Sequence, residues 1–114
     1  MLTEELYQSL LRDLETSITH EKNGELNRSR VIARQVAGKA IRILYSQLNL
    51  DTPQVLTPYQ FLLDVQKYMK IFSPIQEEVT ALTTRVNIDF SFSGKMNLIT
   101  AARNILLFVK DFEE

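Results

Sequence analysis

The chain has 114 residues and a net charge of −1, and it is 45% hydrophobic and 24% charged, which is typical of an ordinary globular protein. It contains no cysteine, which excludes disulfides, thiolate metal sites and cysteine nucleophiles. Its longest apolar run is far shorter than a membrane span, and its N-terminal residues are acidic, whereas a secretory signal begins with basic residues. We therefore expect one domain over residues 1–114, a cytoplasmic location and no membrane contact.

The first predicted helix covers residues 3–22. Apolar side chains recur there at every fourth position, which is one face of an α-helix. The recurring residues are Leu2, Leu6, Leu10, Leu14 and Ile18. Asn23 and Gly24 follow, and both tolerate the left-handed conformation that ends a helix.

The second predicted helix covers residues 27–48 and has a broad apolar face. The small residues Ala33, Ala37 and Ala40 on this face should allow a neighbouring helix to approach closely. Polar side chains are assigned to the opposite side. These are Arg28, Arg34, Gln35, Lys39 and Arg42.

Two proline-led helix starts follow, Thr57-Pro58-Tyr59-Gln60 and Ser73-Pro74-Ile75-Gln76. In each, a hydroxyl can cap the first turn, proline fits the first helical position, and glutamine can bond back to the cap. They predict helices over residues 58–72 and 74–86, meeting at a kink because a proline disfavours helical geometry in the residue before it.

Residues 86–92 alternate between apolar and polar side chains, which is typical of a strand. A single short strand would have no partner, so we predict an extended loop instead. Residues 95–112 then return to a helical pattern with one apolar stripe. The fold prediction is an all-α, single-domain helical bundle of four long helices, with one further short helix left open.

Charge is unevenly distributed along the chain. Residues 1–25 hold six acids and two bases, whereas residues 26–50 hold five bases and no acid. The basic side of the second helix could follow a phosphate backbone or meet an acidic partner. The interpretation that we favour is that the acidic first helix packs beside it and supplies the counter-charge. The candidate interaction residues on this helix are Arg28, Arg34, Lys39 and Arg42.

Evidence for a metal, cofactor or DNA site is weak. His20 is the only histidine, and a metal site there would need Glu21 and Glu25, a spacing that any charged helix end offers. A histidine near a helix C-terminus is favoured by the helix dipole alone. No glycine-rich phosphate loop is present, so we expect no cofactor. The fourth helix opens with Glu77 and Glu78, which argues against insertion into DNA.

Three segments together resemble the HEPN superfamily of small helical bundles. They are the alanine-rich VIARQVAGKA at residues 31–40, TTRVN at residues 83–87, and the apolar AARNILLFV at residues 101–109. The resemblance covers roughly residues 30–112. It implies a helical bundle of a kind found in toxin–antitoxin and nucleic-acid-defence systems, where several members are RNases and others bind protein partners.

The catalytic signature of that family is an arginine with a histidine a few residues further on. Arg85 matches the arginine, and Asn87 and Asp89 follow it. Phe90, Ser91 and Phe92 occupy the region where the histidine is expected. Since phenylalanine cannot transfer protons, the resemblance is one of architecture, and we expect no intrinsic RNase activity.

The function that we predict is a non-enzymatic interaction or regulatory module that acts through a protein partner, as a catalytically silent HEPN-like domain would. The alternative is an RNA-binding or RNA-cleaving protein that uses the basic second helix and Arg85. A homodimer is also expected, because four aromatic side chains are assigned to the surface. These are Tyr45, Tyr59, Phe61 and Tyr68.

Overall fold

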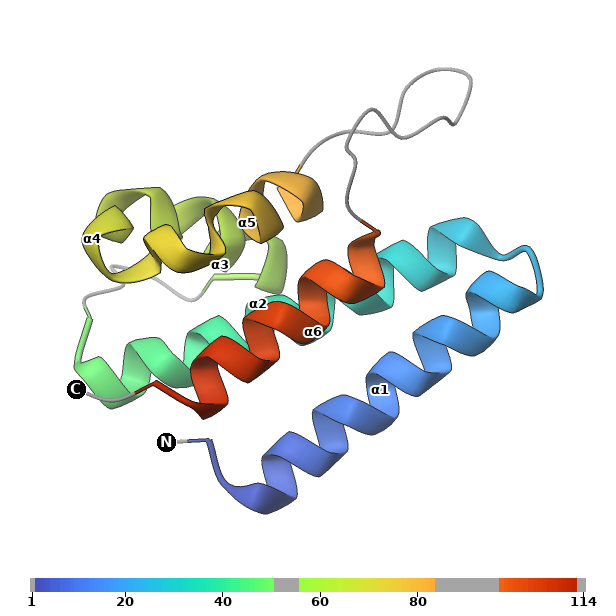
Figure 1. The fold of residues 1–114 in the computed structure, drawn as a ribbon, viewed down its shortest axis with the longest axis horizontal. Coiled ribbons are helices and arrows are strands. Elements are labelled where there is room, and N and C mark those ends of the chain that lie inside the picture. Colours follow the sequence, from blue (N-terminus) through green and yellow to red (C-terminus); the bar gives the residue numbers. More distant parts are fainter. Residues whose placement is uncertain (1, 51–55, 84–96, 113–114) are drawn as a thin grey trace.

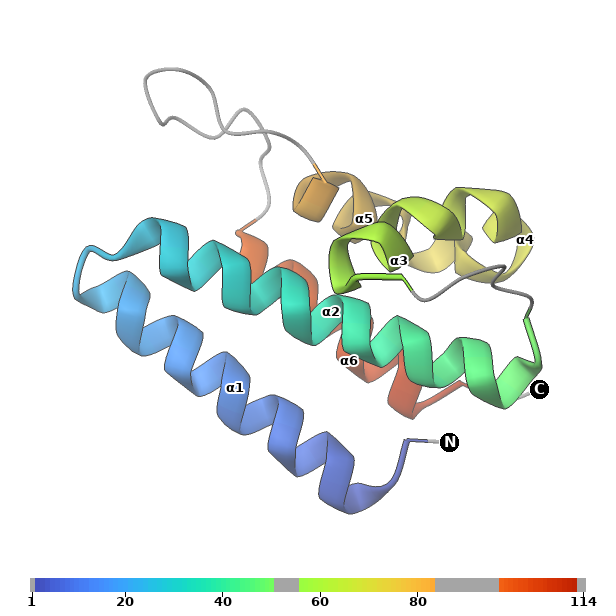
Figure 2. The same ribbon diagram turned by 180° about the vertical axis from the view of Figure 1, so that it is seen from behind.

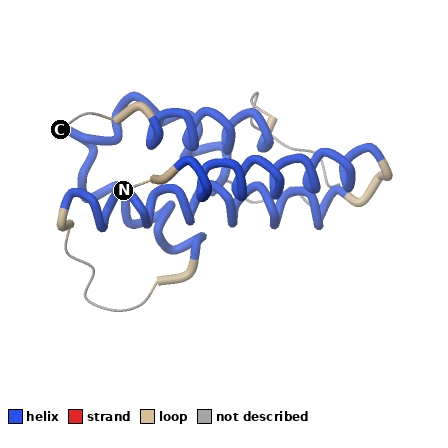
Figure 3. The backbone as a smooth tube through the Cα atoms, turned by 90° about the horizontal axis from the view of Figure 1, so that it is seen from below, coloured by secondary structure: helices blue, strands red, loops and turns tan. Residues whose placement is uncertain are grey.

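The computed structural model describes residues 2–50, 56–83 and 97–112, in which all regular structure is helical (Figures 1 and 3). This confirms the all-α prediction. The predicted extended loop lies outside the described residues. The α-helices are α1 (Glu4–Lys22), α2 (Leu26–Leu48), α3 (Pro58–Asp64), α4 (Met69–Phe72), α5 (Gln76–Thr83) and α6 (Leu98–Lys110). Two 3₁₀ turns, η1 (Val65–Tyr68) and η2 (Ser73–Ile75), join α3, α4 and α5.

Helices α2 and α6 form the centre of the fold. Helix α2 contacts α1, α3 and α6, and α6 in turn contacts α1, α2 and α5. The short helices α3 to α5 lie on the opposite side of this central pair from α1 (Figures 1 and 2). No helix in the described part of the chain is long and apolar enough to cross a membrane.

Helices α1 and α2 form an antiparallel hairpin (Figure 1), and α1 ends at the predicted Asn23-Gly24 stop. Asn23 ends α1, and Gly24 has a φ of 78°, the left-handed conformation that glycine adopts without strain. The apolar stripe of α1 is only partly buried, because Leu6 is 44% exposed. A polar contact lies between the helices instead: the Ser17 hydroxyl donates to the Ser29 carbonyl at 2.7 Å.

The small side chains of α2 are buried, as predicted. Ala33, Ala37 and Ala40 are all fully buried. Gly38, which the periodic pattern does not single out, allows the start of α3 to lie directly against α2. A Cβ added at Gly38 would overlap the backbone of Pro58.

The prediction of one continuous helix over residues 58–72 is wrong, because the chain tightens into 3₁₀ geometry at η1. Tyr68, at the end of η1, has φ −127° and ψ 41°, outside the helical region. Its ring packs edge-on against the Tyr45 ring from α2, with 5.6 Å between centroids. The Tyr45 hydroxyl also donates to Asp64 Oδ2 at 2.8 Å, at the last residue of α3. A residue from another helix therefore fixes the place where the regular helix is interrupted.

The two proline-led starts behave differently. Thr57 has extended backbone geometry, and it forms the predicted capping box with Gln60. The prediction that Ser73 caps a helix is wrong, because Ser73 has helical dihedral angles and makes no capping hydrogen bond. Pro74 lacks an N–H group, so the chain passes this point as a 3₁₀ turn that leads straight into α5.

Two of the four aromatic residues on which the homodimer prediction rests belong to the core. Tyr45 is 2% exposed and Phe61 is 6% exposed, and their rings meet edge-on at 5.3 Å. Burial, followed by the hydrogen bond to Asp64, raises the pKa of Tyr45 above its ordinary value. Tyr59 is 38% exposed, so it is the one exposed member of this set, and Tyr68 is half-buried.

Candidate interaction surfaces

The basic residues of α2 divide into two groups. About 100° separates successive helical residues, so Arg34 lies about 120° around the helix from Arg28, whereas Lys39 and Arg42 lie within about 40° of Arg28. Arg28, Lys39 and Arg42 are all exposed, and we call these three residues the basic stripe. The assignment of Arg34 to the same face is wrong.

Arg34 is half-buried and binds the end of α5. Its Nε donates to the Leu82 carbonyl oxygen at 2.8 Å, and the Tyr59 hydroxyl donates to the next carbonyl, that of Thr83, at 3.2 Å. A cation at a helix C-terminus also interacts favourably with the helix dipole. Burial lowers the pKa of Arg34, yet the guanidinium stays charged at neutral pH. Its contacts are those of a residue that holds α5 against α2.

Helix α1 does not neutralise the basic stripe through ion pairs. Among the described residues, the ion pairs are His20–Glu25, Arg28–Glu25 and Lys67–Asp64. Arg28 therefore pairs with the residue just before its own helix, and Lys39 and Arg42 form no ion pair in the described part of the chain. The expected packing of α1 beside α2 is present, but no ion pair in the described part of the chain joins an acid of α1 to the basic stripe. Arg85, the remaining candidate residue, lies outside the described residues, together with Asn87 and Asp89.

The surroundings of His20 are those of a helix end. Its Nδ1 lies 3.2 Å from Glu25 Oε1, while Glu21 Oε2 accepts a hydrogen bond from Asn97 Nδ2 at 3.1 Å. The two carboxylates considered as fellow metal ligands are thus directed to different partners. No group of three or more potential metal ligands occurs among the residues that the structure describes.

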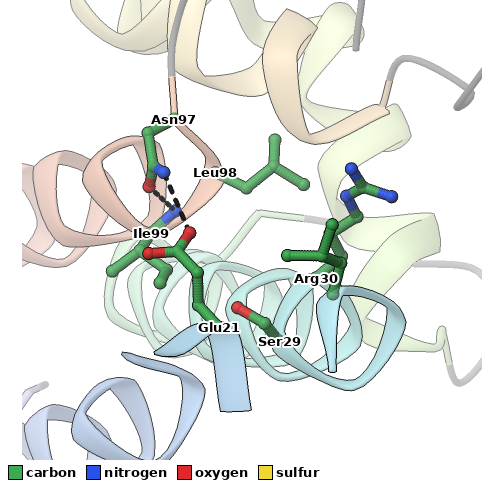
Figure 4. Close-up of a pocket in the computed structure, with 7 residues that line it drawn as sticks. Glu21, Ser29, Arg30, Asn97, Leu98 and Ile99 are labelled. Carbon is green, nitrogen blue, oxygen red and sulfur yellow. Dashed lines mark hydrogen bonds between the residues drawn. The ribbon is translucent and has the colours of Figure 1, made fainter. Parts of the chain in front are cut away.

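A small pocket of about 110 Å³ lies where α1, α2 and α6 meet (Figure 4). Asn97 caps α6 there, because its Oδ1 accepts hydrogen bonds from the backbone N–H groups of Ile99 and Thr100. Its amide nitrogen binds Glu21, as the dashed line in Figure 4 shows. The Arg30 guanidinium lies on the other side of the pocket, directed away from Glu21. The Asn97 amide and the Glu21 carboxylate, which both line the pocket, are thus hydrogen-bonded to each other. This bond joins α1 to the start of α6.

A surface hollow lies between η2–α5 and the second half of α6, and we call it the α5–α6 groove. Its apolar lining consists of Pro74, Ile75, Leu107, Phe108 and Phe112. Its polar lining consists of Glu78, Asn104 and Asp111. Leu107 is 40% exposed, and the rings of Phe108 and Phe112 are half-buried and meet at 5.5 Å between centroids. The groove thus presents contiguous apolar side chains to solvent.

Sequence reasoning missed this groove, although a signal was present. The stripe predicted for residues 95–112 omits Leu107 and Phe108. It consists of Leu98, Ala102, Ile105, Leu106, Val109 and Phe112. The uninterrupted apolar run from Ile105 to Val109 is wider than one buried face requires. Such excess apolar width on a helix indicates a surface that another molecule could cover.

Comparisons with protein-family models, curated proteins and solved structures gave no match. The relationship to the HEPN superfamily therefore stays a prediction.

Proposed function

We propose that this protein is a non-enzymatic interaction module that binds a protein partner in the α5–α6 groove. The observation that supports this proposal is the exposure of Leu107 beside the half-buried Phe108 and Phe112. Partially exposed aromatic and leucine side chains in a concave site are typical anchors of protein recognition. A catalytically silent HEPN-like domain is the kind of protein that would act in this way.

The test uses a library of displayed 15-residue peptides selected against the folded protein. Enriched peptides are then measured against Leu107→Gln and against the control Leu63→Gln. Leu63 is a matched residue, since it is 46% exposed but lies on α3 outside the groove. Glutamine is a good helix former, so both variants should fold.

We expect Leu107→Gln to weaken peptide binding by at least about 10-fold, because a central apolar anchor typically contributes more than 1.4 kcal/mol to binding. Leu63→Gln should bind as wild type does. Peptides equally sensitive to both substitutions, or no enriched peptide at all, would contradict the proposal.

A second candidate function, RNA binding, is favoured by the exposure of Lys39 and Arg42 without an ion pair in the described part of the chain. Binding that depends on phosphate contacts falls steeply with salt. The test is the fluorescence anisotropy of a labelled generic RNA, measured over about a tenfold range of salt concentration, from about 20 to about 200 mM. Binding to wild type should fall steeply over this range, and Lys39→Gln/Arg42→Gln should bind little RNA. No binding at low salt would remove this alternative.

A further inference from the structure

We infer that the α5–α6 groove takes a short amphipathic helix whose apolar face is flanked by lysine or arginine. This inference rests on the proposed docking function and adds the chemistry of the partner. It depends on the charges around the groove, on the backbone of its walls and on its length.

The charged residues that line the groove are both acidic. Glu78 lies on α5 and Asp111 immediately follows α6, and neither forms an ion pair among the described residues. Within the described part of the chain Glu78 makes one polar contact, and it is neutral, since Asn104 Nδ2 donates to Glu78 Oε2 at 3.0 Å. These two carboxylates therefore lie beside an apolar surface without a cationic partner in the described part of the chain.

Lys110, the base next to Asp111, is directed away from the groove. Its Nζ lies 4.0 Å above the ring of Tyr7 on α1. Its charge is used in a cation–π contact on the side of α6 that faces α1. A cation from a partner would thus meet Glu78 and Asp111 without a competing lysine in the groove lining.

The groove walls favour a helix over an extended peptide. Both walls are helical, so most of their backbone N–H and C=O groups are bonded within the wall. An extended peptide would find no sheet edge to pair with there, whereas a helix satisfies its own backbone. From Asn104 to Asp111 the α6 wall spans about 10 Å, or about two helical turns, which suits apolar anchors at positions i, i+4 and i+7.

The test compares two synthetic helical peptides of about 14 residues that share one apolar face. Lysine flanks the face in one peptide, and glutamate replaces each lysine in the other. Anisotropy is measured with wild type, with Glu78→Gln/Asp111→Asn, and with Glu5→Gln/Glu15→Gln. The last variant is the matched control, because it removes two exposed acids from α1 and changes the net charge equally.

We expect the lysine peptide to bind wild type at least about 10-fold more tightly than the glutamate peptide. The groove variant should weaken the lysine peptide by about 3- to 10-fold, as loss of two rim charge pairs would, and the α1 variant should leave it unchanged. Glu78→Lys/Asp111→Lys should reverse the preference. Equal binding of the two peptides, or equal effects of the groove and α1 variants, would overturn the inference.

Failure of this inference differs from failure of the docking function. Library peptides that need Leu107 but carry neutral or acidic flanks would overturn the basic partner and leave the docking function in place. Concentration-dependent dimerisation that Leu107→Gln abolishes would identify a second copy of this chain as the occupant, which also overturns the basic partner. Absence of any Leu107-dependent binding would overturn both proposals.

Discussion

Replacing Arg34 by methionine removes the guanidinium that binds the end of α5 while it keeps a long unbranched side chain. The substitution leaves the Leu82 carbonyl without its 2.8 Å donor from α2. A hydrogen bond to a charged group contributes about 1.5–3 kcal/mol, and the half-exposed position of Arg34 reduces this through solvent screening. We therefore expect Arg34→Met to lower the free energy of unfolding by about 1–2 kcal/mol.

The matched control is Lys39→Met, which removes a cation from an exposed position of the same helix. Its free energy of unfolding should stay within about 0.5 kcal/mol of wild type. Urea unfolding followed by circular dichroism measures the stability of both variants. An unchanged dependence of the unfolding free energy on urea concentration shows that both expose the same amount of surface as wild type when they unfold. If Arg34→Met is as stable as Lys39→Met, then Arg34 does not hold α5 in place, and its guanidinium would return to the set of binding candidates.

Three further predictions test the packing and the caps. Gly38→Ala should cost about 1–3 kcal/mol in urea unfolding, because its Cβ would overlap the Pro58 backbone; a stability at or above wild type would refute that contact. Folding raises the pKa of Tyr45, so above about pH 10 this side chain ionises in the unfolded chain but not in the folded one. The free energy of unfolding of wild type should therefore fall by up to about 1.4 kcal/mol per pH unit through this group. Tyr45→Phe should lack this loss, and parallel alkaline stability curves of the two proteins would contradict the assignment. Thr57→Ala should cost about 1 kcal/mol and Ser73→Ala much less, because only Thr57 accepts a capping hydrogen bond; equal losses in thermal melts would argue against this difference.

The local parts of the fold could be predicted from the sequence because local interactions determine them. Apolar side chains at every fourth position define α1, and Asn23-Gly24 defines its end. The Thr57 capping box lies entirely within four residues. The interruption after α3 could not be predicted in this way. It depends on Tyr45, which is distant in sequence and meets Asp64 and Tyr68 only after folding.

The candidate site residues also divide into those whose position follows from local sequence and those whose contacts form only in the folded chain. Helical geometry alone separates Arg34 from Arg28, so that part of the error was avoidable. The hydrogen bond from Arg34 to the Leu82 carbonyl joins residues 48 positions apart, so it could not be predicted from local sequence. The α5–α6 groove likewise forms from Leu107 and Phe108 only when η2 and α5 supply the facing wall.

The most direct test of the docking function is an amide-shift titration of the isotope-labelled protein with a peptide enriched by selection. The account predicts shifts concentrated in residues 74–78 and 104–112, which include the lining of the α5–α6 groove. Shifts centred on Lys39 and Arg42, with none along the groove, would contradict it.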